Sequence, residues 1–197
     1  MVKINKKYAH ILEAAQSLFW KHGFKRVSIE EVCQNAGVSK MTFYKHFPNK
    51  IELAKTIFDN VVVKGEIEFR NIMKSNLSPA EKINKVLLLK LESTNDISPE
   101  FMQDFYAGGE PELKAYVEQR TRKAWEVLRN DYQQAQKEGV FRNNLNIDFL
   151  IKVQFKLIEL INDESVTSMF ENRQQLIMEF ARLLVYGIIP ATNEKES

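Results

Sequence analysis

The stretch Val27–Phe47 limits the fold more than any other part of the sequence, because it reads as two short helices joined by a tight turn. Ser28 and Glu31 stand at the spacing of a capping box, which marks the start of the first helix. Gly37 ends that helix at a place where a positive φ is easiest for glycine. Ser39 is a good N-cap for the second helix. The stretch therefore predicts a helical hairpin.

The second helix of this hairpin has an apolar side and a polar side. Phe43 and Phe47 are four residues apart, so they share the inward face. The other faces carry basic, hydroxyl and aromatic side chains, namely Lys40, Thr42, Tyr44, Lys45 and His46. A short capped helix with such side chains suits entry into the major groove of DNA. The alternative is a structural role, since many soluble proteins contain a helical hairpin with a glycine turn.

The identity of these residues favours DNA binding. Ala36–Lys50, with the sequence AGVSKMTFYKHFPNK, closely resembles the signature of the TetR family of bacterial transcriptional regulators. That signature runs approximately A-G-V-S-x-x-T-L/F-Y-x-H/Y-F-x-x-K-x-x-L, and every fixed position is matched through Lys50 and Leu53. The resemblance covers about residues 5–60. It implies an all-α fold with an N-terminal three-helix helix-turn-helix head, joined by a long helix to a larger helical body for ligand binding and dimerisation.

The predicted DNA contacts come from hydroxyl, basic and aromatic side chains around the hairpin. They are Ser28, Ser39, Lys40, Thr42, Tyr44, Lys45, His46 and Lys50. Lys40 and Thr42 lie near the start of the second helix, and we assign them to base edges or nearby phosphates. The others are assigned to phosphates, which set the register and carry little sequence information. Helix N-termini attract anions, which supports the serines and Lys50 in this role.

The charge is distributed unevenly along the chain, although the net charge is only +2. Residues 1–55 contain ten Lys and Arg against four Glu, a net charge of +6. The remainder contains 18 basic and 22 acidic side chains, a net charge of −4. A basic segment on an acidic body predicts a nucleic-acid surface at one end.

Beyond the hairpin the sequence predicts long helices, because seven Gly and five Pro are few for 197 residues. The expected helices run over about 48–76, 78–93, 111–138, 147–162 and 173–189, with a short segment after Ser98. We expect residues 1–50 to form the DNA-binding domain and 51–190 to form the helical ligand-binding and dimerisation domain. The tail at 191–197 is predicted to be disordered.

The last two helices have apolar arcs wider than one core face requires. Each should therefore bury a second face, and the simplest partner is the same pair of helices in a second subunit about a two-fold axis. The residues assigned to this homodimer interface are Phe149, Val153, Leu157, Leu160, Phe180 and Leu184. The alternative is that both helices are buried within one monomer. The resemblance favours the dimer, because TetR-like proteins pair through their last two long helices.

Aromatic side chains of the body can be core residues or the wall of a ligand pocket. The resemblance implies a small-molecule effector inside the body, and the aromatic content favours an apolar or aromatic compound of unknown identity. The candidates for contact with it are Phe101, Phe105, Tyr106, Trp125 and Phe155. No cofactor is expected.

Several classes of protein are disfavoured. A single Cys allows no internal disulfide, which is typical of the reducing cytoplasm. No apolar run approaches the ~18 residues of a membrane span. The start of the chain does not resemble a signal peptide. The three His residues lack ligand spacing with one another, and no Ser/His/Asp grouping is suggested, so neither a metal site nor an enzyme is expected.

The sequence therefore predicts a cytoplasmic, dimeric, ligand-responsive transcriptional regulator, with repression favoured over activation. It should bind a palindromic double-stranded operator and be released by a small-molecule inducer, with no membrane partner. The alternative is an architectural or ligand-independent DNA-binding dimer.

Overall fold

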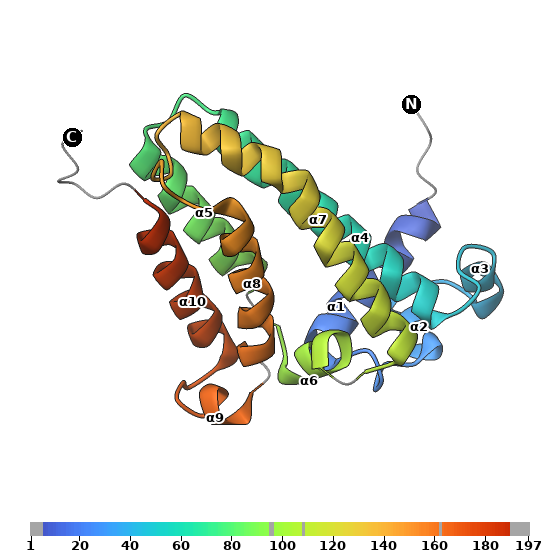
Figure 1. Cartoon of the computed structure of the whole chain (residues 1–197). Helices are drawn as coiled ribbons and strands as arrows, with labels where there is room; N and C mark the ends of the chain where they lie inside the picture. Colours follow the sequence, from blue (N-terminus) through green and yellow to red (C-terminus); the bar gives the residue numbers. More distant parts are fainter. Residues whose placement is uncertain (1–5, 95–96, 108, 162, 190–197) are drawn as a thin grey trace, which may run out of the picture. The chain divides into compact units, whose positions relative to one another are not determined.

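The computed structural model describes residues 6–94, 97–107, 109–161 and 163–189, and every regular element among them is helical (Figure 1). The all-α fold predicted from the sequence is confirmed. The tail at 191–197, predicted to be disordered, lies outside the described residues.

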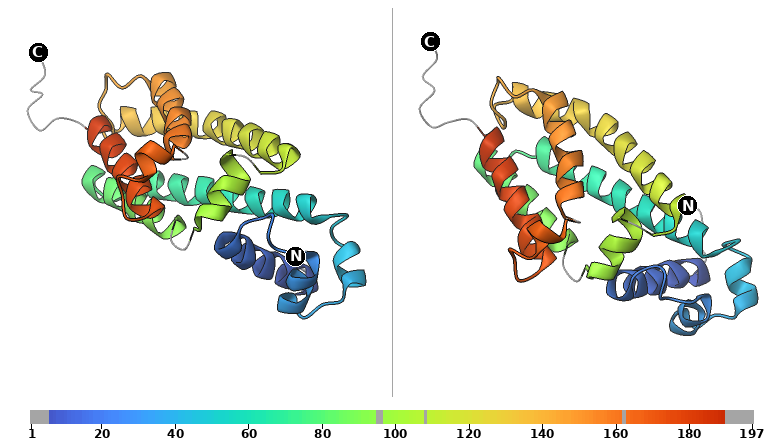
Figure 2. Two further views of the ribbon diagram at one scale, coloured as in Figure 1. Left: turned by 90° about the horizontal axis from the view of Figure 1, so that it is seen from below. Right: turned by 60° about the horizontal axis from the view of Figure 1, so that its bottom comes forward.

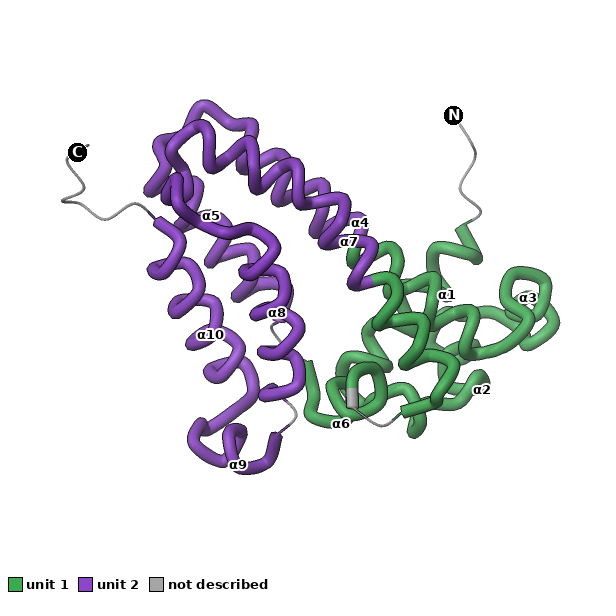
Figure 3. Tube along the Cα trace, viewed as in Figure 1, with its two compact units in different colours: residues 1–62, 96–120 green, residues 63–95, 121–197 purple. Residues whose placement is uncertain are grey.

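The described helices belong to two compact units, each built from two separate stretches of the chain (Figure 3). Unit 1 comprises residues 1–62 and 96–120, and unit 2 comprises residues 63–95 and 121–197. The boundary at residue 50 stays a prediction about the DNA-binding motif. The compact unit that contains this motif extends beyond residue 50, to residue 62, and also includes the later segment 96–120.

The first three helices lie in unit 1, and the second and third of them begin at the predicted serine caps. α1 spans Lys6–His22 and is followed by Gly23, which has a φ of +78°. α2 spans Ile29–Ala36, with the predicted capping box at its start and Gly37 in the left-handed conformation at its end. α3 spans Lys40–Tyr44 and begins at the predicted serine cap. The helical hairpin is therefore confirmed.

The core of this three-helix group consists of side chains that recur at helical spacing. α1 buries Ile11, Ala15 and Phe19 completely on one stripe. Val32 of α2 and Phe43 of α3 are also fully buried. Because all three helices contact one another, this small core fixes the direction in which α3 presents its outer face.

A later segment of the chain packs on the same helices within unit 1. α6 spans Pro99–Met102 and continues into the π-helix η1, Gln103–Ala107. The backbone N–H of Ser98, the N-cap of α6, donates to the carbonyl of Trp20 in α1 at 3.0 Å. α6 therefore begins directly against α1, where both elements bury apolar side chains.

An aromatic cluster holds this segment in place. Phe105 has no exposed surface, and its ring centroid lies 4.4 Å from that of Phe101. It also lies 6.5 Å from Phe19, 6.3 Å from Phe24 and 6.4 Å from Phe58. Aromatic pairs at these separations stabilise a core beyond simple burial. Phe24 thus makes the hydrophobic contact expected of a residue that follows a glycine-terminated helix.

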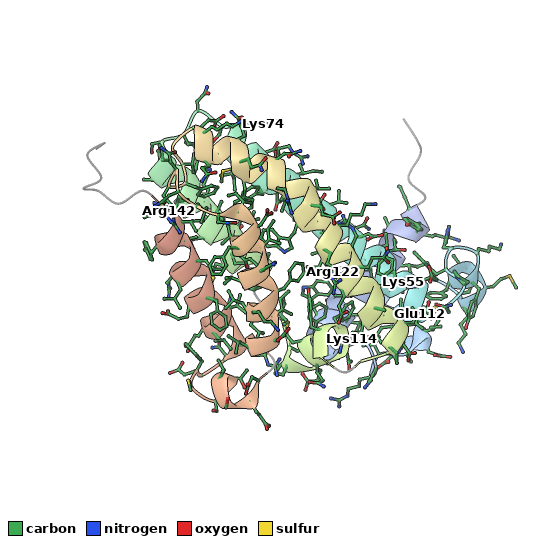
Figure 4. All side chains as sticks on the ribbon, in the orientation of Figure 1. Lys55, Lys74, Glu112, Lys114, Arg122 and Arg142 are labelled. Atoms are coloured by element: carbon green, nitrogen blue, oxygen red, sulfur yellow. The ribbon has the colours of Figure 1, made fainter. Side chains whose placement is uncertain are left out.

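Two long helices contribute residues to both units. α4 spans Lys50–Lys74 and α7 spans Pro111–Lys137, close to the predicted lengths. Within unit 1 they are joined by Lys55 of α4, which donates to Glu112 of α7 at 2.7 Å and to a second carboxylate on its own helix (Figure 4).

Unit 2 contains the remaining helices. α5 spans Pro79–Ser93, α8 spans Ile147–Ile161 and α10 spans Arg173–Ile188, and α10 lies against α5 and α8 (Figure 2). The sequence did not predict the four-residue α9, Glu164–Thr167. A helix of one turn has too few residues to show an apolar period, so only its aspartate cap could have indicated it.

The core of unit 2 is built around Tyr132 of α7. Its ring stacks on Phe69 at 4.9 Å and on Phe141 at 5.2 Å. Phe141, in the loop that follows α7, is 2% exposed and anchors that loop in the core. Other members of this core are Met73, Ile83, Ala135, Val140, Leu145, Ile147, Leu150, Val185 and Ile188.

Candidate nucleic-acid interface

α3 divides its side chains between core and solvent, as a reading helix requires. Phe43 and Phe47 are buried, at 0% and 3% exposure. Met41 and Tyr44 project outward, at 73% and 54% exposure. Met41, Tyr44 and Lys45 are three and four residues apart, so they occupy one face of the helix. This exposed face is the candidate surface for the major groove.

Met41 was missed in the sequence analysis, although the helical period points to it. Two residues of an α-helix turn through about 200°, so Met41 lies on the side opposite the buried Phe43.

The ammonium of Lys40, assigned to base edges or phosphates, is engaged in an ion pair with the carboxylate of Glu30 on α2. The hydrogen bond between them lowers the pKa of Glu30 and raises the pKa of Lys40. Both side chains are more than half exposed, so water screens the pair and it contributes little to stability. Contact with DNA would require Lys40 to exchange this partner for a phosphate or a base.

The hydroxyls assigned to DNA contacts are used within the two helix caps. Ser39 Oγ accepts the backbone N–H of Thr42 at 3.2 Å and lies 3.1 Å from its hydroxyl. The Ser28 hydroxyl donates to Glu31 Oε2 at 2.8 Å. Bonds from the backbone N–H and the hydroxyl of Ser28 hold the pKa of Glu31 below its ordinary value. Ser28 therefore has a carboxylate beside it, and its contact with a phosphate stays a prediction.

Lys50 was also expected to attract a phosphate, and in this structure its ammonium contacts backbone carbonyls instead. Its ammonium donates to the carbonyls of Phe24 at 2.8 Å, Val27 at 2.7 Å and Lys25 at 3.4 Å. An ammonium has three protons, so all of its donors are used. Nζ also lies 4.3 Å from the centroid of the Phe24 ring, and burial lowers the pKa of Lys50. Lys50 thus ties the start of α4 to the turn between α1 and α2.

The same turn is held from its other side by Asp104 of η1. The buried carboxylate of Asp104 accepts the backbone N–H of Lys25 at 2.8 Å. The turn between α1 and α2 is therefore fixed by a cation on its carbonyls and an anion on its N–H. No local pattern could indicate this contact, because the two residues are 79 positions apart.

His46 and Lys45, assigned to phosphates, follow α3. The His46 ring is half-buried and meets the edge of Tyr8 at 5.6 Å. Tyr8 in turn stacks on Phe47 at 5.3 Å. Lys45 is exposed at the C-terminal end of α3. Tyr44 and Lys45 are therefore exposed like Ser39 and Lys40, and contact with DNA stays a prediction for each of them.

The aromatic ligand candidates are divided between the two units. Phe101 and Phe105 are core residues of unit 1 with 2% and 0% exposure, so they present no surface to a ligand in this structure. Tyr106 is half-buried in the same unit, and burial raises its pKa to about 12. Trp125 and Phe155 are half-buried in unit 2.

The residues predicted for the dimer interface differ in exposure. Phe149 and Leu160 of α8 are exposed, at 65% and 38%. Val153, Leu157 and Phe180 are half-buried. Leu184 is also half-buried and packs against the unit 2 core, and its place in a dimer interface stays a prediction. The neighbouring residues Leu183 and Tyr186 are the exposed apolar side chains of α10, at 62% and 66%.

The described residues also bear on three other features: a surface hollow, a metal site and a membrane-spanning helix. A shallow hollow of about 430 Å³ on unit 1 is lined in part by His10, Glu13 and Asn35, and it includes none of the aromatic candidates. Over the described ranges no group of three or more His, Cys, Asp or Glu is arranged to hold a metal ion. Within those ranges, no helix has both the length and the apolar character needed to cross a membrane.

The hairpin with its exposed α3 and the helical unit that follows define a helix-turn-helix DNA-binding protein. Residues 11–57 match the model of the bacterial regulatory proteins of the tetR family. The chain is 24% identical over 190 residues to the HTH-type transcriptional regulator YdgC of Bacillus subtilis, with 93% of each chain covered. It is 23% identical over 157 residues to the HTH-type transcriptional repressor KstR2 of Mycobacterium tuberculosis, with 76% of each covered.

A solved structure of similar fold is the fatty acid degradation regulator FadR from Bacillus halodurans. Its TM-score is 0.66 at 17% identity, over 93% of this chain and 96% of that one. Sequence motif, relatives and fold agree: residues 11–57 match the tetR family, and the chain as a whole is similar to HTH-type transcriptional regulators in sequence and in fold.

Proposed function

We propose that this chain is a ligand-responsive, dimeric repressor that binds a palindromic operator and is released by a small-molecule inducer. The observation that carries the proposal is the exposed face of α3, where Met41, Tyr44 and Lys45 project from a helix whose other side is buried. The basic N-terminal segment supplies the attraction to phosphates.

A two-fold dimer would present two copies of α3 to one side of the duplex. Half-sites about one helical turn apart, or a multiple of that, would then mirror the symmetry of the protein. Exposed Phe149, Leu183 and Tyr186 on α8 and α10 support these helices as the dimer surface, since exposed apolar clusters mark interaction sites.

Release by an inducer requires only that the inducer prefer the conformation that does not bind DNA. A preference of about ten-thousand-fold, or about 5.5 kcal/mol, reverses a 99:1 population. Half-buried Trp125 and Phe155 of unit 2 support an apolar or aromatic inducer, such as an acyl derivative.

The proposal is tested by selecting duplexes from a random DNA pool and titrating salt against the selected duplex. We expect a palindrome. The Lys40→Ala, Tyr44→Ala double variant should lose at least tenfold in affinity, while Lys74→Ala, which removes an exposed lysine from unit 2 (Figure 4), should bind normally. Unchanged affinity in the double variant would refute DNA reading by α3. Enrichment of no sequence, with binding that only fades with salt, would favour the architectural alternative.

The inducer is sought with tryptophan fluorescence. The chain has two tryptophans, so Trp20→Phe leaves Trp125 of unit 2 as the sole reporter. Acyl and aromatic compounds that change its emission should also weaken operator binding, and the operator should weaken their binding by the same factor. Compounds that bind without altering operator affinity would support the ligand-independent alternative.

A further inference from the structure

We infer that Met41 determines operator specificity by contacting the methyl group of a thymine in each half-site. The inference rests on the proposed DNA-binding function and goes beyond it, because it names both the side chain and the base feature that it recognises.

The first argument is the position of Met41. At 73% exposure it is the most exposed large apolar side chain of unit 1 among the described residues. A single exposed apolar residue is ordinary on a protein surface. Met41, however, projects from the helix whose opposite side, Phe43, is fully buried, and it shares its face with Tyr44 and Lys45. Any duplex bound by this face meets Met41.

The second argument concerns the neighbouring polar side chains. Lys40 is paired with Glu30, and the hydroxyl of Thr42 lies 3.1 Å from that of Ser39 within the cap. The side chain of Met41, in contrast, is apolar, so it has no hydrogen bond or ion pair to give up when DNA binds. It can therefore enter the groove without breaking an existing contact, while the exposed cation of Lys45 provides charge complementarity to the phosphates.

The third argument is chemical. The thioether of methionine donates no hydrogen bond and accepts only weakly, so it cannot read the donors and acceptors of base edges. The apolar group on the major-groove edges of the bases is the C5 methyl of thymine. Methionine is long, flexible and polarizable, which suits contact with such a group. The base opposite Met41 is therefore a thymine.

The experiment replaces each thymine of the selected operator by deoxyuridine, which keeps base pairing and removes only the methyl group. Replacement in one half-site should weaken binding of the unaltered protein about fourfold, the factor expected for one methyl-sized apolar contact, and replacement in both half-sites roughly fifteenfold. The Met41→Ala variant should bind methylated and unmethylated duplexes alike. Measurement at reduced salt keeps this variant within range.

Two further variants control for bulk and for exposure. Met41→Leu retains an apolar side chain and should keep the sensitivity to the methyl group. Met169→Ala removes a methionine of equal exposure, 74%, from unit 2 and should bind as the unaltered protein does.

The inference is overturned if no thymine replacement weakens binding, or if each weakens Met41→Ala as much as the unaltered protein. In both cases sequence-specific binding survives, so the proposed function stands without this contact. Failure to select any sequence would instead remove the proposed function together with the inference.

Discussion

Removing the ammonium of Lys50 should destabilise unit 1 strongly. Lys50→Met keeps the length of the side chain but leaves the carbonyls of Phe24 and Val27 without the partly buried bonds they accept at 2.8 and 2.7 Å. Hydrogen bonds to charged groups contribute about 1.5–3 kcal/mol each. The third bond, at 3.4 Å and exposed, is easily replaced by water. Loss of the contact with the Phe24 ring adds about 0.5–1 kcal/mol.

Part of this loss is offset, because the variant no longer has to desolvate a charge. A net destabilisation of about 3 kcal/mol follows. With m of about 2–3 kcal/mol per M, the urea midpoint should fall by about 1–1.5 M. The assay is urea unfolding at fixed protein concentration in a Trp125→Phe background, where Trp20 reports on unit 1.

Lys45→Met is the matched control, since it removes an exposed lysine from the same group of helices and should change stability by less than about 0.5 kcal/mol. The reasoning is refuted if Lys50→Met leaves the midpoint unchanged and instead lowers DNA affinity with a salt slope reduced by about one. That result would mean that Lys50 binds a phosphate, as its position in the sequence first indicated.

Four further predictions each concern the substitution of one residue. Glu30→Gln removes the ion-pair partner of Lys40 and a negative charge. In filter-binding or anisotropy assays, DNA affinity should therefore rise severalfold and depend more steeply on salt concentration. An unchanged slope of affinity against salt concentration would contradict this prediction. Gly23→Ala would place a Cβ 2.7 Å from Asp104 Oδ2 at a residue with a positive φ. Thermal unfolding should therefore show a loss of about 2–4 kcal/mol in the free energy of unfolding. An unchanged unfolding transition would show that the turn can relax. Hydrogen bonds from Ser78, the N-cap of α5, hold the pKa of Glu81 below 4.5. The contribution of this carboxylate to stability is therefore present above pH 4.5 and lost as pH falls through the lowered pKa. Glu81→Gln should flatten the decline in stability measured below pH 4.5, and a profile identical to that of the unaltered protein would argue against the Ser78–Glu81 bond. Phe149→Glu should shift sedimentation toward monomer, whereas Val127→Glu on α7 should not, and an intact dimer would exclude α8 from the interface.

Local patterns in the sequence were sufficient for most of the fold. The caps at Ser28, Ser39, Ser78 and Ser98 each begin a helix in the structure, because a side chain that accepts an early backbone N–H acts within three residues of itself. The buried positions of Phe43 and Phe47 could also be predicted, because helical spacing alone determines which face a residue occupies.

The candidate site was predicted less completely, because its side chains also bond outside their own helices. Lys50 occupies the predicted position but bonds to a turn more than 20 residues earlier, and Asp104 reaches the same turn from 79 residues away. Lys40 meets Glu30 on another helix. Such partners depend on the packing of helices, which periodicity within one helix does not encode.

The packing of α6 and η1 onto α1 has a consequence for the order in which the protein forms during synthesis. The N-terminal helices of unit 1 are synthesised first, yet Phe19, Phe24 and Phe58 find their partner in Phe105. At about 5–20 residues per second the ribosome needs several seconds to travel from the end of the hairpin to η1. A nascent chain therefore carries an unfinished aromatic surface during that interval. Transplanting α1 to α3 with the first part of α4 onto another regulator would leave the same surface bare, so an exchange of operator specificity on that scale has to carry η1 with it or preserve its ring contacts.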